Sequence, residues 1–177
     1  MPFEDKENLT DLKTFTDTVY FNDDAHFYGK ILGDLTFSEP VTLENSGIVQ
    51  QLFEKVVVKD TEILNGTVDI NIYEGSLIKY ENDATGNFSF NFKGELNLSM
   101  TNKRSLTVSI LCPMGSSAYV ITSSNQVRID GTVHTVKWIG SSSPSSGFTN
   151  SINVYTFVLI KNNVDDYTIL GSLSRFG

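Results

Sequence analysis

The chain has 177 residues, of which 40% are hydrophobic and only 19% are charged, and its formal net charge is −8 at pH 7. Residues 1–84 contain 17 Asp and Glu against 6 Lys and Arg, whereas residues 85–177 contain 4 against 7. Because phosphate contacts require clustered Lys and Arg, this distribution argues against nucleic-acid binding. The length allows one large or two small domains with a buried core.

The first segment, MPFEDKENLTDLK, lacks the basic and apolar regions of a secretory signal. No apolar run reaches the ~18 residues that span a bilayer, so we expect no membrane insertion. Residues 1–13 are acidic and polar, with only Phe3, Leu9 and Leu12 as apolar anchors. We expect an acidic N-terminal arm there that is ordered only against a partner.

The composition favours β structure over helix. Alanine, the best helix former, occurs only three times, whereas Phe, Tyr, Val, Ile and Thr, which favour strands, are abundant. We therefore predict an all-β fold with two parts after the arm. The first is an elongated, repetitive β stem and attachment region over 14–84. The second is a compact antiparallel β-sandwich or barrel head over 85–177.

Two stretches of the predicted stem align at an offset of 37 residues, VYFNDDAHFYGKI (19–31) and VVVKDTEILNGTV (56–68). Apolar character matches at four positions, and three further positions are identical: Val19 with Val56, Asp23 with Asp60, and Gly29 with Gly66. Repeats of this length indicate stacked units that cannot bury their apolar faces alone. Between the copies, the i, i+4, i+8 spacing of Ile48, Leu52 and Val56 makes a short helix over 47–55 an alternative to a strand.

The region after residue 85 shows short segments typical of strands. NFSFNF (87–92) places three phenylalanines on one face, and SLTVSIL (105–111) alternates in the same way. QVRID and TVHTVKW flank Gly131, and Asp-Gly between two such runs predicts a tight hairpin. INVYTFVLI (152–160) is apolar on both faces and is predicted to be a central strand, and DYTILGSL (166–173) follows a polar turn.

We expect no catalytic, cofactor or metal site, and hence no enzyme. His26 and His134 are the only histidines and lie in different regions, which disfavours a zinc or transition-metal site. The pairs Asp23/Asp24 and Asp165/Asp166 lack the ligand spacing of a calcium loop and are interpreted as surface turns. The single cysteine, Cys112, lies in the apolar run SILCPM and is expected to be a buried, unreactive thiol.

The basic residues of the second half are scattered, and we interpret all of them as solvated surface groups. They are Lys93, Lys103, Arg104, Arg128, Lys137, Lys161 and Arg175.

Trp138, the only tryptophan, lies where the predicted strand 132–138 meets the serine-rich loop of KWIGSSSPSSGF (137–148). If exposed, it could stack on a sugar ring together with Tyr119 and Tyr155. Because Trp138 closes a strand that follows a hairpin, we favour packing against Tyr155 within a β core. The 140–148 loop is then the better candidate for an exposed tip.

The apolar residues of 14–84 are spread too evenly along the chain for a closed monomeric core. We expect them to be buried between identical chains, in a homotrimer or, as the alternative, a dimer.

Three segments resemble a C-terminal domain found in virion structural and tail-fibre-like proteins of marine cyanophages: residues 87–94, 126–161 and 167–177. In that family an Asp-Gly strand leads to Lys-Trp, a Gly/Ser/Pro/Asn loop, a Tyr-containing strand and a Phe near the end. The matching positions are Asp130, Gly131, Lys137, Trp138, Gly140, Pro144, Gly147, Tyr155, Lys161, Tyr167, Leu170 and Phe176. Residues 99–117 depart from the family pattern and agree with it in strand character only.

The resemblance implies a trimeric component of a bacteriophage particle, assembled in the host cytoplasm and attached to other virion proteins through its N-terminal region. The resemblance does not fix whether it is a tail fibre, baseplate or head appendage. The alternative is a carbohydrate- or receptor-binding adhesin module on the host-facing tip, with a host glycan or protein as partner. A polysaccharide-degrading enzyme ranks last, because glycoside hydrolysis needs paired carboxylates and residues 85–177 have only four acids.

Overall fold

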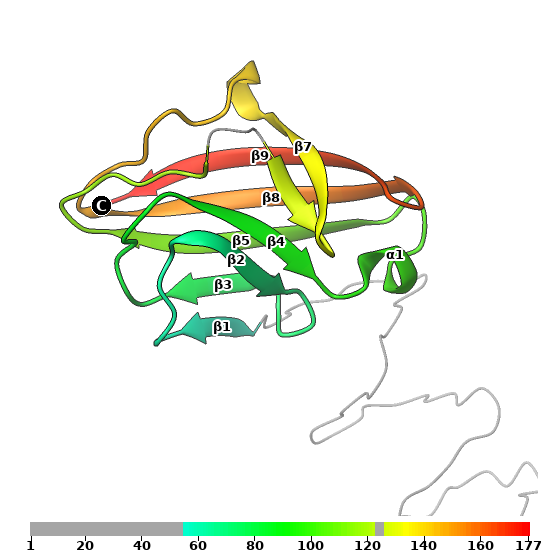
Figure 1. The fold of residues 1–177 in the computed structure, drawn as a ribbon, viewed down its shortest axis with the longest axis horizontal. Coiled ribbons are helices and arrows are strands. Elements are labelled where there is room, and N and C mark those ends of the chain that lie inside the picture. The colour runs from blue at the N-terminus through cyan, green and yellow to red at the C-terminus, as the bar shows by residue number, and fades with distance from the viewer. Residues whose placement is uncertain (1–54, 123–125) are drawn as a thin grey trace, which may run out of the picture. The chain divides into compact units, whose positions relative to one another are not determined.

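The computed structural model describes residues 55–122 and 126–177, which belong to one compact unit. They form nine strands, one helix of four residues and one 3-10 turn, so the predicted β character is confirmed (Figure 1). The elements are β1 (Val56–Lys59), β2 (Gly66–Asn71), β3 (Leu77–Tyr80), β4 (Phe88–Lys93), α1 (Leu96–Ser99), β5 (Ser105–Met114), β6 (Gln126–Ile129), β7 (Thr132–Trp138), η1 (Ile139–Ser141), β8 (Ser151–Asn163) and β9 (Asp166–Phe176).

Several predictions concern segments outside the described residues. They are the arm over 1–13, the first repeat copy at 19–31, His26, and the Asp23/Asp24 pair. The helix considered for 47–55 also lies there except for Lys55, which precedes β1 and has no regular structure.

From β1 to β6 the chain alternates between two walls of the sheet. Strands β1, β3 and β5 are parallel neighbours in the first wall, and β2, β4 and β6 are parallel neighbours in the second wall. Leu77 lies beside Val56, and Phe88 lies beside Gly66. The first turn of this parallel coil therefore takes 21 residues in the first wall and 22 in the second, and the next turn takes 32 residues from Leu77 to Ser109 and 37 from Asn91 to Arg128.

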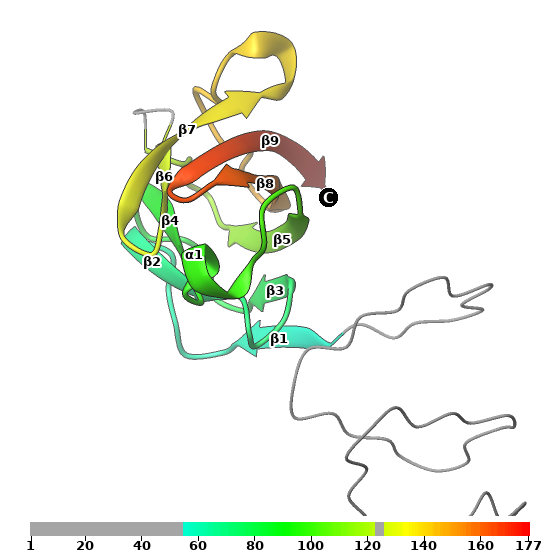
Figure 2. The same cartoon turned by 90° about the vertical axis from the view of Figure 1, so that its right-hand side faces the viewer.

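Three long C-terminal strands connect the walls. β8 and β9 form an antiparallel hairpin that extends the first wall from β5, and β7 links β9 to β6. Viewed along the strands, the sheet is curled, with the two walls facing each other and α1 at one end (Figure 2). Within the part of the chain that the structure describes, β1 and β2 are the two edge strands.

The predicted antiparallel sandwich or barrel is confirmed only in part, because the sheet curls into a half-barrel (Figure 2) but is mixed, and five of its eight strand pairs are parallel. Alternation along a strand reports which face is buried and is the same for either pairing direction. The short connections here cross from one wall to the other, which lets neighbours in each wall run in the same direction. The strands β1–β3, expected in a separate stem, share this sheet with the strands after residue 85.

The side chains between the walls form one hydrophobic core. Phe88, Phe90 and Phe92 point inward from β4, as the alternation of 87–92 predicts, and none of them is exposed. Their rings meet Tyr155 and Phe157 of β8 at centroid distances of 5.4–5.9 Å, mostly edge to face. Aromatic pairs in this geometry contribute about 0.5–1.5 kcal/mol beyond their buried area. The prediction that 152–160 is central is confirmed, since β8 lies between β5 and β9.

The predicted Asp-Gly hairpin joins β6 to β7. Asp130 and Gly131 both have positive φ, at 47° and 89°, as a two-residue hairpin turn of the type I′ class requires. The Asp130 carboxylate has a second role, because Oδ1 accepts the N–H groups of Gly94 and Glu95 and Oδ2 accepts that of Leu96. The hairpin therefore satisfies backbone donors at the start of α1.

Lys161 holds the other end of α1, which corrects the prediction that it is a solvated surface group. Only 3% of the residue is exposed, and its Nζ donates to the carbonyl oxygens of Leu96, Asn97 and Met100 at 3.3, 2.6 and 2.6 Å. The Asn97 and Met100 carbonyls are among those that a helix end leaves without intrahelical partners, whereas the Leu96 carbonyl also accepts the N–H of Met100 at 3.2 Å. The other six basic residues of the second half are exposed, as predicted.

Replacing Lys161 with Met should lower the free energy of unfolding by about 1–3 kcal/mol, because the carbonyls of Asn97 and Met100 lose their donor while the apolar stem is kept. Urea denaturation followed by the fluorescence of Trp138 measures the change. The control is Lys137→Met at an exposed position of β7, for which a change within about 0.5 kcal/mol is expected. Equal losses in the two variants would contradict the role given to Lys161.

Candidate functional site

Trp138 lies in the core and not on a surface platform. It is 7% exposed, and its ring packs edge to face on Phe157 and Tyr155 at 5.7 and 6.4 Å. The backbone of β9 passes close to it at Gly171, where a Cβ would come within 2.9 Å of the indole ring. The interpretation of Trp138 as a packing residue is therefore confirmed.

The two tyrosines considered with Trp138 do not make an aromatic platform with it. Tyr155 is fully buried, and its hydroxyl accepts the N–H of Ile121 at 3.3 Å. Burial raises the pKa of Tyr155 above its usual range. Tyr119 is partly buried against the core. In contrast, the 140–148 loop is largely exposed, as predicted for a tip.

The titratable residues singled out in the sequence are dispersed. Cys112 is fully buried, and burial raises the pKa of its thiol, in agreement with the predicted inert cysteine. Asp165 and Asp166 lie at the β8–β9 turn, where they accept hydrogen bonds from Asn97 and Asn162. Within residues 55–122 and 126–177, no group of three or more His, Cys, Asp and Glu side chains could hold a metal ion.

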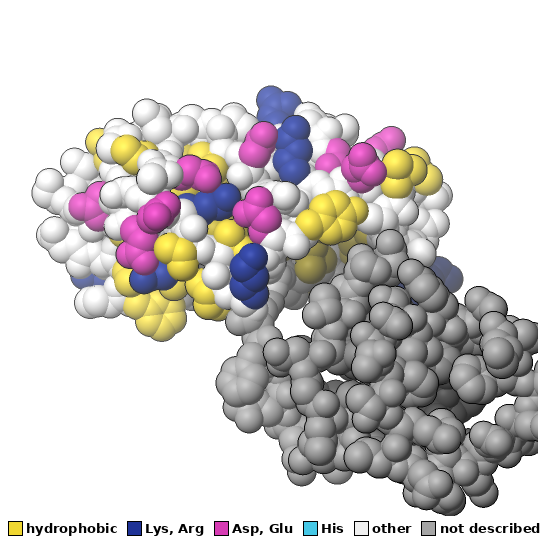
Figure 3. All heavy atoms as spheres, turned by 90° about the horizontal axis from the view of Figure 1, so that it is seen from below, with side chains coloured by type: hydrophobic (Ala, Val, Ile, Leu, Met, Phe, Trp, Pro, Cys, Tyr) yellow, Lys and Arg dark blue, Asp and Glu magenta, His cyan; other side chains and the backbone are white. Residues whose placement is uncertain are grey.

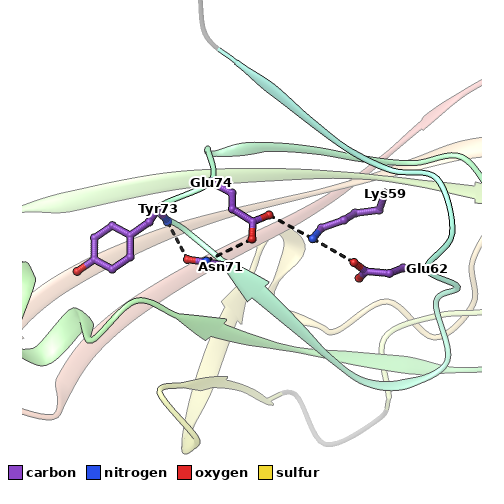
Figure 4. A network of polar contacts seen from close by, with 5 residues as sticks. All are labelled: Lys59, Glu62, Asn71, Tyr73 and Glu74. Carbon is purple, nitrogen blue, oxygen red and sulfur yellow. Dashed lines mark hydrogen bonds and ion pairs between the residues drawn. The ribbon is translucent and has the colours of Figure 1, made fainter. Parts of the chain in front are cut away.

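Lys59 is the centre of a polar network near the edge strands (Figure 4). Its Nζ lies 3.1 Å from Glu62 and 3.2 Å from Glu74, and Glu74 also accepts a hydrogen bond from Asn71 of β2. Burial acts to lower the pKa of Lys59, but the hydrogen bonds and charges of the two glutamates outweigh it and raise the pKa. The network links the ends of β1 and β2.

Seen from below, charged and hydrophobic side chains are mixed on the surface of the molecule (Figure 3).

The outer surface of the second wall is polar. Its outward positions on β2, β4 and β6 are Thr67, Asp69, Asn71, Ser89, Asn91, Lys93, Gln126 and Arg128. Neighbouring strands are joined there by side-chain hydrogen bonds, from Asn91 to Asp69 at 2.7 Å and between Thr67 and Ser89 at 3.1 Å. Such a surface is well suited to contact with water.

The part of the first wall's outer surface that β5, β8 and β9 form is different, and we call it the β5–β8–β9 face. The alternating burial of the three strands identifies its seventeen outward positions. They are Ser105, Thr107, Ser109, Leu111 and Pro113 of β5, Ile152, Val154, Thr156, Val158, Ile160 and Asn162 of β8, and Asp166, Thr168, Leu170, Ser172, Ser174 and Phe176 of β9. Asp166, beside the β8–β9 turn, is the one charged residue among them, and Lys79 of β3 borders the face next to Leu111. Leu170 and Phe176 are 42% and 60% exposed.

A shallow groove of about 360 Å³ opens on the same face. It is lined by Lys137, Trp138 and Ile139 at the end of β7, Thr156 and Val158 of β8, and Leu170, Gly171 and Ser172 of β9. Its lining is mainly apolar, with one ammonium group and two hydroxyl groups. The groove and the β5–β8–β9 face are the candidate functional surface of the described residues.

Sequence patterns alone did not identify this surface. The alternation of β5 and β9 predicts their inward residues, and the apolar outward residues of 152–160 are typical of a central strand. The signal that could have found the face is the near absence of charge at the outward positions of three neighbouring strands, where Asp166 is the one charged residue.

Comparisons with protein-family models, curated proteins and solved structures found no match to this chain. No helix among the described residues is long and apolar enough to cross a membrane.

His134 makes the stability of the chain dependent on pH. Its ring packs on Tyr167 at 5.3 Å, and its Nε2 is buried without a hydrogen-bond partner among the described residues. Burial lowers the pKa of His134 and outweighs the opposing charges of Asp165 and Asp166. The unfolded chain therefore binds a proton more readily, so the contribution of neutral His134 is complete above the ordinary pKa of 6.5 and is lost as the pH falls below it.

We expect His134→Leu to remove this part of the pH dependence. Urea denaturation at a series of pH values on both sides of 6.5 measures the slope of unfolding free energy against pH. The His26→Gln variant is the control for the second histidine. An unchanged slope in His134→Leu would show that other groups produce the dependence.

Proposed function

We propose that the chain is a structural subunit of a bacteriophage particle, a fibre or appendage subunit. It docks through its N-terminal region and projects the β unit of residues 55–177. The parallel coil is the observation that carries this proposal. Stacked β units of this kind extend in one direction, because each turn of the coil presents paired strands to the next.

The sequence repeat supports the same interpretation. Its second copy, 56–68, covers β1, the crossing loop and the start of β2, which is one passage from the first wall to the second. The pattern that the two copies share includes the residues that shape this passage: Val57 and Leu64 are buried, and Gly66 has a positive φ of 64°. The matching residues in the first copy are Tyr20, Phe27 and Gly29, of similar character. A repeated coil-forming segment is typical of an extended structural protein.

The resemblance of residues 87–94, 126–161 and 167–177 to cyanophage virion proteins is the reason for proposing that the extended protein belongs to a phage particle. Several of the matching positions have structural roles here. Asp130 and Lys161 hold α1, Gly131 forms the hairpin turn, and Trp138 and Tyr155 pack in the core. The proposed partners are other virion proteins and further copies of this chain, and the proposed location is the virion.

Deletion of residues 1–40 tests the docking role. We expect the shortened chain to be absent from purified particles, while its Trp138 fluorescence remains that of a buried indole. The full-length chain is the control and should be detected in the same particles. Incorporation of the shortened chain at the full-length level would overturn docking through the N-terminal region, and absence of the full-length chain would overturn the particle-subunit role.

The groove beside Trp138 favours a second candidate function, a carbohydrate- or receptor-binding module. Apolar walls with a few polar groups are common in small-molecule sites. A glycan array probed with the full chain tests it, and Lys137→Ala should reduce any signal at least tenfold if the groove binds the glycan. A matched change on the second wall, Arg128→Ala, should leave the signal unchanged. Equal loss in both variants, or no signal from the full chain, would count against this function.

A further inference from the structure

We propose that the β5–β8–β9 face packs against the same face of a second copy of this chain, in a two-fold arrangement centred on Thr156. The inference rests on the subunit role proposed above and gives that subunit a surface for self-association. A dimer, the alternative considered from the sequence, is thereby favoured over a trimer.

The first reason is the contrast between the two outer surfaces. Both walls are built from strands that alternate in the same way, yet β2, β4 and β6 of the second wall have no hydrophobic residue at their eight outward positions, and the β5–β8–β9 face has only one charged residue among its seventeen, Asp166 beside the β8–β9 turn. Charged residues are depleted from the buried centre of protein interfaces, and contiguous apolar patches on a surface mark interaction sites. The β5–β8–β9 face is therefore the surface that is better suited to a protein partner.

The second reason identifies the partner. The outward residues of β8 are Ile152, Val154, Thr156, Val158 and Ile160, an order of residue types that is the same in both directions. A two-fold axis that lies in the interface and crosses β8 at Thr156 therefore places each outward residue of β8 opposite a residue of the same type. Contacts of a two-fold dimer are self-complementary in this way, since the same patch is used by both subunits.

The outward residues of the flanking strands do not read the same in both directions, but the row through Thr156 contains only hydroxyl side chains. Both β5 and β9 run antiparallel to β8, and their residues beside Thr156 are Ser109 and Ser172. The Oγ of Ser109 lies 3.2 Å from Thr156 Oγ1, so small hydroxyl groups satisfy one another at the centre of the face. Branched apolar residues lie on both sides of this row: Val158 and Leu170 on one side, and Val154 and Leu111 on the other. Two such surfaces can approach closely at the centre and bury apolar groups around it.

The third reason is size. Three strands spaced about 4.8 Å apart, with ten residues each at about 3.4 Å per residue, make a face of roughly 500 Å². Two copies would bury roughly 1,000 Å² from the planar area alone, which reaches the lower bound for a specific interface. The groove adds contact area, because side chains from the second copy could enter it between Val158 and Leu170.

The test introduces a lysine into each of two similar pairs of hydroxyl side chains, one on the β5–β8–β9 face and one on the second wall. Thr156→Lys puts like charges near the proposed axis, and Ser89→Lys puts the same charge on the second wall, where Ser89 contacts Thr67 at 3.1 Å. Light scattering after size-exclusion chromatography at micromolar concentration measures the mass. We expect twice the 19.6 kDa chain mass for the wild type and for Ser89→Lys, and 19.6 kDa for Thr156→Lys.

Leu170→Glu provides a second variant if Thr156→Lys does not fold. Leu170 is 42% exposed, so a carboxylate there can reach solvent in the monomer but not in the dimer, and we expect the single-chain mass. Circular dichroism and Trp138 fluorescence report folding in every variant.

Three results would overturn the inference. The first is a monomeric wild type, which would mean that another part of the chain or a different protein covers the face. The second is a wild-type mass of three chains. The third is a dimer that persists in folded Thr156→Lys or Leu170→Glu. A monomer that still enters phage particles would overturn the self-association and leave the subunit role standing. A dimer that is absent from particles would overturn the subunit role and leave the self-association standing.

Discussion

Aromatic packing between β4 and β8 is the interaction on which the rest of the structure depends. Phe88, Phe90 and Phe92 project from the second wall into the space where Tyr155 and Phe157 project from the first. The five rings fill the distance between the walls, and Trp138 extends the cluster beneath β9. The strands β1–β3 are short, and a coil of such strands can be stable only if its two walls share a core of this size.

This packing leaves the outer surfaces free to differ. Each wall must present its apolar residues inward, but nothing in the core determines what the outward positions contain. The second wall has polar and charged residues joined by side-chain hydrogen bonds, whereas the β5–β8–β9 face has small hydroxyl and branched apolar residues. The difference is therefore attributable to what each surface contacts, and it links the fold to the proposed assembly of the chain.

The end of the sheet beside α1 depends on two polar residues instead of on apolar packing. Asp130 accepts three backbone N–H groups at the start of α1, and Lys161 donates to three carbonyl oxygens within and after it. Asn97 of α1 also accepts hydrogen bonds from the N–H of Asp165 and the hydroxyl of Tyr167. Lys161 was assigned to the surface because an isolated lysine is usually solvated, and no local pattern shows that three carbonyls converge on it.

The amino-acid sequence by itself determined the strands, their buried faces and the Asp-Gly hairpin. Alternating apolar residues and turn-forming pairs are local features, so the inward phenylalanines, the central 152–160 strand and the buried Cys112 could be predicted from neighbours in the chain. Only the tertiary structure decided the parallel order of β1 to β6, the burial of Lys161 and the largely uncharged face over β5, β8 and β9. These features depend on which strands become neighbours, and that choice is made by packing between residues far apart in the sequence.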